Sequence, residues 1–167
     1  MCTIEKTLYT FAELSDDAKE KAREWYREGA FDYEWWEFVF YDAKACGELL
    51  GIEVERIYFS GFWSQGDGAL FEGEYRYRKG WRKALRAAIG GDDLETLEAI
   101  GEALQGTQRR AFYQITATTR QNGRYCHPGY MAVSVDATTP AGDDIRHEFE
   151  SLEGDITDAL RDFATWT

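Results

Sequence analysis

The chain has 167 residues, of which 44% are hydrophobic and 16% aromatic, so it can bury a core without disulfides or metals. Its 31 acidic and 19 basic residues give a net charge of −12, which argues against direct nucleic-acid binding and favours partners with a basic surface. The three cysteines and two histidines are too scattered to predict a disulfide or a metal site, and we expect no cofactor. Because no apolar stretch has the length of a signal peptide core or a membrane span, we expect a cytoplasmic protein that does not contact membranes.

The first elements expected along the chain are a short strand and a helix. Residues 3–9 alternate weakly between polar and apolar, as a strand does. Thr10 and Glu13 have the spacing of a capping box, so a helix should begin after Thr10 and end at Gly29.

A second helix is predicted over residues 33–50, because apolar residues recur there at helical spacing. Its expected buried stripe consists of Trp36, Val39, Phe40, Ala43, Gly47 and Leu50. Most of the burial should come from the first four of these residues. Trp35, Phe38 and Tyr41 widen the apolar face, so this face is either covered on both sides or kept in part for a partner. Cys46 lies on the same face and should be a buried thiol.

A hairpin and two further helices are expected next. Residues 52–60 and 69–78 read as strands, and a change of phase across Val54–Ile57 indicates a bulge. A basic helix over 81–89 and an acidic helix over about 92–104 should follow. Six basic residues gather around the first of these helices: Arg76, Arg78, Lys79, Arg82, Lys83 and Arg86. Since the chain as a whole is acidic, we expect them to pair with its own acidic helices.

A second hairpin is predicted over residues 111–119 and 130–136. On its core side, Tyr113, Ile115 and Ala117 should face Met131, Val133 and Val135. The elements in this order predict a single domain over residues 1–167. Its expected class is α+β, with an antiparallel sheet of about four to five strands packed by several helices.

The C-terminal helix is the element that the sequence predicts most clearly. Thr139 and Pro140 form a start signal, and apolar residues then recur at helical spacing as far as Trp166. Residues 136–167 contain nine acidic and two basic residues, so the outer face of this amphipathic helix should be anionic. The carboxylates expected on that face belong to Asp144, Glu148, Asp155, Asp158 and Asp162. Successive turns place them about 5.4 Å apart, which is comparable to the phosphate spacing along a strand of nucleic acid.

The loop of the first hairpin, SGFWSQGDGA (60–69), is the most unusual stretch of the sequence. Phe62 and Trp63 offer stacking area, Gln65 and Asp67 offer hydrogen-bonding groups, and the glycines permit tight turns. Two interpretations stand side by side: a recognition loop for a partner, or a well-packed turn in which Trp63 covers the core. No nucleophile pair, phosphate-binding loop or zinc-ligand spacing is present, and we expect no catalytic residue.

Three segments together resemble a family of small, largely uncharacterised proteins from phage and prophage genomes. These segments are YTFAELSDDAKEKAREWYREG, DYEWWEFVFYDAKACGELLGIE and IYFSGFWSQGDGALFEGEYRY, in the first half of the chain. The most specific part of the resemblance is FSGFWSQGDGA with the FEG that follows it. The resemblance implies a mobile-element setting and no particular activity, while the second half of the chain departs from the pattern.

A small acidic protein in that setting is similar in character to anti-CRISPR and other anti-defence inhibitors. The expected function is therefore to bind a host defence complex that has a basic surface and to block its nucleic-acid site, with carboxylates in place of phosphates. Two alternatives remain open at this point. One is a small-ligand-binding protein or enzyme that uses the loop over 60–69, and the other is a structural or accessory phage protein.

Overall fold

The computed structural model describes residues 9–31, 34, 36–61, 66–137 and 146–167, without the side chains of 30, 31 and 146–150. The described chain divides into two compact units, Met1–Glu37 and Phe38–Thr167. Nearly all of the strand expected over residues 3–9 lies outside the described residues. The single domain expected over the whole chain stays a prediction.

The first unit contains a 3-10 turn, η1 (Phe11–Glu13), and an α-helix, α1 (Asp16–Phe31). The backbone N–H and the hydroxyl of Thr10 both donate to the Glu13 carboxylate, at 2.8 and 2.7 Å, and these bonds lower the pKa of Glu13. The predicted Thr10–Glu13 pair is therefore confirmed, but it closes the short turn instead of starting the helix. The helix begins after Ser15, whose hydroxyl accepts from the Ala18 N–H at 3.4 Å, and it continues past Gly29.

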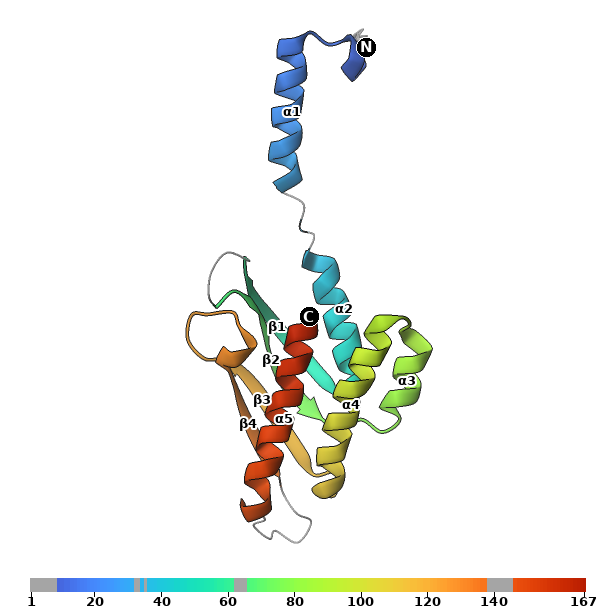
Figure 1. The fold of residues 1–167 in the computed structure, drawn as a ribbon, viewed down its shortest axis with the longest axis vertical. Helices are drawn as coiled ribbons and strands as arrows, with labels where there is room; N and C mark the ends of the chain where they lie inside the picture. The colour runs from blue at the N-terminus through green and yellow to red at the C-terminus, as the bar shows by residue number, and fades with distance from the viewer. Residues whose placement is uncertain (1–8, 32–33, 35, 62–65, 138–145) are drawn as a thin grey trace, which may run out of the picture. The chain divides into compact units, whose positions relative to one another are not determined.

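The second unit, into which the helix α2 leads, holds the sheet and the remaining helices. The elements are α2 (Trp36–Leu50), β1 (Ile52–Ser60), β2 (Gly68–Arg76), α3 (Trp81–Ala88), α4 (Asp92–Arg110), β3 (Ile115–Gln121), a 3-10 turn η2 (Pro128–Tyr130), β4 (Met131–Ala137) and α5 (Arg146–Trp166). The strands form an antiparallel sheet in the order β1-β2-β3-β4. Figure 1 shows α2, α4 and α5 on one face of this sheet and α3 on the outer side of α4. The α+β fold and the long C-terminal amphipathic helix are thus confirmed.

The core lies between the sheet and these helices. Phe163 of α5 and Phe71 of β2 are both fully buried and meet edge to face, with ring centroids 5.4 Å apart. Gly73 pairs with Val54 on β1, and a Cβ at this glycine would lie 1.9 Å from the carbonyl oxygen of the preceding Glu53, so only glycine permits this strand pairing. The register between β1 and β2 shifts between Val54 and Arg56, which confirms the predicted bulge.

The burial of α2 differs from the prediction. Its buried residues are Ala43, Cys46, Gly47 and Leu50. Trp36, Val39 and Phe40 are only partly buried, so the prediction that they carry most of the burial is wrong. The reason is that the C-terminal half of α2 meets the core, where Gly47 approaches Phe163 and Val54.

The link from α4 to β3 also differs from the prediction. The helix continues to Arg110, six residues beyond the expected end, and β3 starts at Ile115 instead of residue 111. Tyr113, which was expected on the core side of a strand, lies in the turn between them with 42% of its surface exposed. The cause is the buried side chain of Gln108, which bonds to the main chain of Ile115. These bonds hold the start of β3 against the last turn of α4, so the residues between them form a turn.

Candidate functional site

The loop over 60–69 packs against the loop that joins β3 and β4. Gly66 has a φ of +101°, and a Cβ there would lie 2.7 Å from the Tyr125 ring, so glycine is required by both the backbone and the contact. Ser60 and Asp67 close the first loop through a hydroxyl–carboxylate bond of 3.0 Å. The Asp67 carboxylate therefore holds the hairpin turn together. Phe62, Trp63 and Gln65 of the same predicted site lie outside the described residues.

The second of these loops is held by its own contacts. The Tyr125 and Tyr130 rings lie 4.9 Å apart between centroids, and the Arg124 guanidinium lies over the Tyr125 ring at 5.0 Å. His127 Nδ1 accepts a hydrogen bond from the Gly129 N–H at 3.0 Å, which fixes the start of η2. This bond gives His127 a structural role in the turn.

The four arginines of the basic cluster around α3 pair with carboxylates of the same unit, and three of them pair with acids of helices, as predicted. Arg82 bonds to Glu102 of α4, and Arg86 bonds to Glu98, which lies one helical turn before Glu102. The Arg86 guanidinium holds the pKa of the Glu98 carboxyl below its ordinary value. On the sheet, Arg76 pairs with its neighbour Glu74 at 2.7 Å. These arginines are therefore neutralised by carboxylates of the same unit.

The outer face of α5 carries the predicted acidic row, but its members have different surroundings. Asp155 pairs with Arg110 of α4 at 2.7 Å, so its charge is compensated. Asp158 and Asp162 are exposed, and within the described part of the chain no basic residue pairs with them. Asp144 and the side chain of Glu148 lie outside the described residues.

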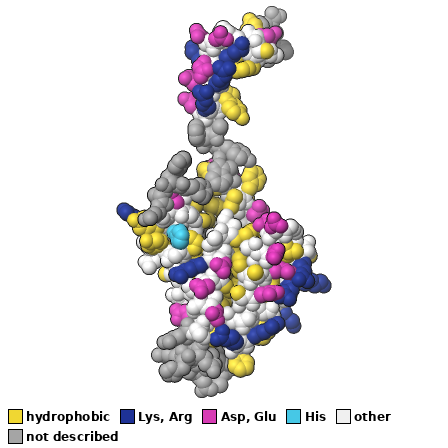
Figure 2. Space-filling model, viewed as in Figure 1, with side chains coloured by type: hydrophobic (Ala, Val, Ile, Leu, Met, Phe, Trp, Pro, Cys, Tyr) yellow, Lys and Arg dark blue, Asp and Glu magenta, His cyan; other side chains and the backbone are white. Residues whose placement is uncertain are grey.

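The acidic row continues from α5 onto α4. The indole N–H of Trp166 donates to the Asp93 carboxylate at 2.9 Å, and Asp162 precedes Trp166 by one helical turn. Burial raises the pKa of the Cys46 thiol, and the charges of Asp42 and Asp93 raise it further. Asp42 of α2 therefore lies near the same thiol as Asp93 and adds another carboxylate at this end of the row. We call the exposed carboxylates of Asp93, Asp158 and Asp162 the acidic face. Figure 2 shows Asp and Glu side chains over α4 and α5, with Lys and Arg gathered at the outer side of α3.

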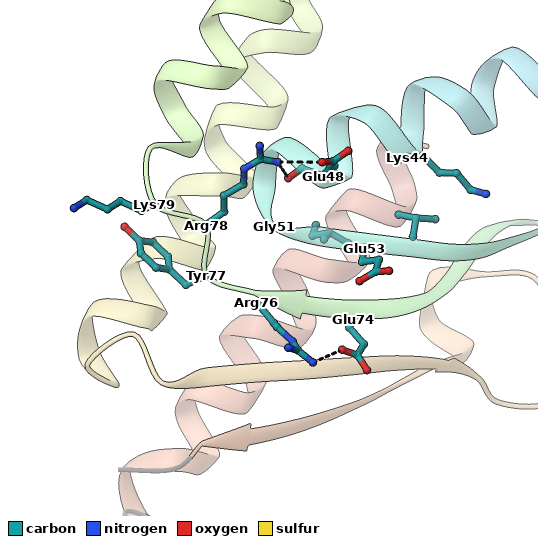
Figure 3. A pocket seen from close by; sticks show the side chains of 11 residues that line it. Lys44, Glu48, Gly51, Glu53, Glu74, Arg76, Tyr77, Arg78 and Lys79 are labelled. Carbon is teal, nitrogen blue, oxygen red and sulfur yellow. Dashed lines mark hydrogen bonds and ion pairs between the residues drawn. The ribbon is translucent and has the colours of Figure 1, made fainter. Parts of the chain in front are cut away.

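A cleft of about 680 Å³ lies where α2, β1 and the end of β2 meet (Figure 3). Its charged lining residues are Lys44, Arg76, Arg78 and Lys79, together with Glu48, Glu53 and Glu74. Arg78 binds the backbone carbonyl of Glu48 and lies 3.9 Å from its carboxylate. The two lysines have no ion-pair partner among the described residues. The sequence had grouped the arginines and Lys79 but not Lys44, because Lys44 belongs to a helix more than thirty residues earlier.

The turn between α4 and β3 contains the site residues that the sequence did not indicate. Phe112 and Tyr113 both have positive φ, at 51° and 61°, and Phe112 has 73% of its surface exposed. Neither residue type favours this conformation, so no local signal predicts such a turn. Only the contacts made by Gln108 place it here.

No group of three or more His, Cys, Asp or Glu side chains within the described ranges is placed to hold a metal ion. No helix of the described chain is both long and apolar enough to cross a membrane.

Neither a curated protein nor a solved structure matches the chain. A family model, the domain of unknown function DUF8835, matches residues 35–167, which is most of the chain, and the protein therefore belongs to this family.

Proposed function

We propose that this protein binds a basic surface of another protein through its acidic face, and that the target is a host defence complex that binds nucleic acid. The observation that carries the proposal is that some exposed carboxylates of this unit have a basic partner among the described residues and others do not. Asp158 and Asp162 have no basic partner among the described residues, whereas Glu98 and Glu102 are paired with arginines. Unpaired carboxylates on a rigid helix remain available to lysine and arginine side chains of a partner.

The geometry of α5 makes this surface suitable as a competitor for phosphate. Carboxylates one turn apart on a helix lie about 5.4 Å from each other, and the buried stripe beneath them keeps the helix from rotating. That stripe consists of Leu152, Ile156, Ala159, Leu160 and Phe163. A row of this kind fits a groove that normally holds a phosphate backbone. The resemblance of the first half of the chain to phage and prophage proteins supports an anti-CRISPR-like inhibitor as the sharpest form of the proposal.

The loop over 60–69 is a weaker candidate for the site of action. Asp67 is bonded to Ser60, and Gly66 packs on Tyr125, so the described part of the loop has a clear structural role. We therefore favour the acidic face over a small-molecule or catalytic function at this loop.

The test is a binding assay with purified CRISPR effector complexes and their target DNA. The parent protein should inhibit DNA binding by at least one complex, and the inhibition should weaken as salt screens the charges. The double variant Asp158→Lys/Asp162→Lys should lose the inhibition while its circular dichroism spectrum stays that of the parent. Asp155 is left unchanged because its reversal would place a lysine against Arg110.

A matched control carries the same change of charge elsewhere. Asp17→Lys/Glu24→Lys alters two exposed acids of α1 in the other unit, and it should inhibit as the parent does. Equal inhibition by the parent and by the α5 double variant would show that the acidic face is not the interface. Absence of inhibition across all complexes would reject this class of target.

A further inference from the structure

The turn between α4 and β3 has a backbone conformation that its residues do not favour. The N–H of Tyr113 donates to the Gln108 carbonyl at 2.7 Å, and the N–H of Phe112 donates to the Arg109 carbonyl at 3.4 Å. This is the hydrogen-bond pattern of a Schellman motif, in which glycine normally occupies the position of Phe112. Here two consecutive aromatic residues adopt left-handed φ values instead.

The structure beneath the turn holds it in this conformation. The side chain of Gln108 is fully buried, and its amide nitrogen donates to the Ile115 carbonyl at 2.7 Å. The Ile115 N–H donates in return to Gln108 Oε1 at 3.2 Å. An unfavourable backbone that is fixed from below in this way is typical of functional sites. Its visible result is that Phe112 and Tyr113 are presented at the surface.

The aromatic rings of the turn adjoin unpaired positive charge. Tyr113 lies against Tyr77, with ring centroids 4.5 Å apart, and Tyr77 also lines the cleft. Lys79 follows two residues later and extends to the same side as Tyr77 (Figure 3). Arg109 is exposed on the row of α4 that faces α3, one turn beyond Gln105, which bonds to Trp81.

The local charge here is opposite to that of the chain. Among the four arginines of residues 106–135, Arg110 pairs with Asp155, Arg120 pairs with Glu55 and Arg124 lies in the loop between β3 and β4, so Arg109 is the cation beside the turn. Neither Lys79 nor Arg109 pairs with a carboxylate of the described residues. At physiological salt, charges further away than about 8 Å are largely screened, so the neighbouring cations outweigh the net charge of −12 for a ligand in contact with this patch.

We propose that this patch, made of Tyr77, Lys79, Arg109, Phe112 and Tyr113, binds single-stranded nucleic acid. A base would stack on the exposed rings of the turn, and the adjoining phosphates would lie against Lys79 and Arg109. A single strand fits better than a duplex, because the base faces of a duplex are already covered by stacking. An acidic peptide could satisfy the cations but has no flat ring for each of the aromatic side chains.

The test uses the full chain and fluorescently labelled oligonucleotides in an anisotropy titration at low and at physiological salt. Single-stranded oligothymidine should bind, and the affinity should fall as salt rises. Phe112→Gly should lower the affinity by about 5- to 150-fold, the range expected for the loss of one stacked base. Glycine is favoured in this backbone conformation, so the variant should fold at least as well as the parent.

Matched variants separate stacking, charge and the acidic face. Tyr41→Ala removes an aromatic residue that is 71% exposed on α2 and should leave the affinity unchanged. Arg109→Glu should weaken binding, whereas Lys21→Glu on α1 should not. Asp158→Lys/Asp162→Lys should retain full binding here, so this proposal can fail or succeed independently of the proposed inhibition.

Three results would overturn the proposal. The first is no binding of the single strand at low salt. The second is equal binding of the parent to the matching duplex or to polyglutamate, which would show recognition of charge or of a protein partner. The third is unchanged affinity of Phe112→Gly.

Discussion

Replacement of Gln108 by leucine should destabilise the protein strongly, although the two side chains have similar volume. The Gln108 amide is fully buried and makes two bonds to the main chain of Ile115, itself only 1% exposed. Leucine would leave a buried N–H and a buried C=O without partners, at about 1–3 kcal/mol each. The apolar burial of leucine offsets part of this cost, so we expect a net loss of about 2–4 kcal/mol.

The measurement is urea denaturation followed by far-ultraviolet circular dichroism, with equal slopes for parent and variant. Gln108→Glu provides a control of nearly identical shape. A protonated glutamic acid can both donate to and accept from Ile115, whereas the ionised form can only accept. Burial should therefore raise the pKa of this carboxyl in the folded state above the unfolded value of about 4.3.

The sign of the resulting pH dependence follows from this shift. A group whose folded pKa is raised contributes its full stability below the unfolded pKa and loses it as the pH rises through the folded pKa. The deficit of Gln108→Glu relative to the parent should therefore be smaller at pH 4 than at pH 7. A loss below about 1 kcal/mol in Gln108→Leu, or an equal deficit of Gln108→Glu at both pH values, would refute the reasoning.

Two other predictions concern the core. Phe163→Ala should cost about 3–5 kcal/mol in urea denaturation, because the ring is fully buried against Phe71, and a cost near zero would contradict the packing of α5 on the sheet. Burial raises the pKa of Tyr75 to about 12, with the neighbouring Gln108 lowering it in part. The stability that this shift contributes is complete below pH 10 and is lost as the pH rises through 12, so unfolding free energies at pH 9 and pH 11 should differ by less in Tyr75→Phe than in the parent.

The two proposed surfaces carry opposite charge within one unit. The acidic face runs from Asp158 to the end of α5, where Trp166 meets Asp93, whereas Arg110, beside the aromatic turn, pairs with Asp155, one turn before Asp158. The antiparallel packing of α4 and α5 therefore places Asp93 and Asp162 toward one end of this helix pair and the aromatic turn at the other.

Periodicity in the sequence was sufficient to predict most elements and the class of the fold. The apolar stripe of α5, the strands of the first hairpin and the bulge after Val54 all depend on spacing along a short segment. The pairing of the arginines in the basic cluster followed from the excess of acidic residues, because opposite charges within one compact unit attract each other. These features depend on spacing within one segment or on the overall composition, and both can be read directly from the sequence.

Only the tertiary structure decided which residues of each pattern remain available. Asp155 and Asp162 look alike on a helical projection, but only Asp155 has an arginine of another helix beside it. The stripe of α2 continues through Trp36, yet burial is complete only from Ala43 onward, where the sheet and α5 cover the helix. The exposed turn at Phe112 exists because Gln108 bonds to a strand seven residues later. Each outcome depends on contacts between separate elements, and spacing within one element carries no information about them.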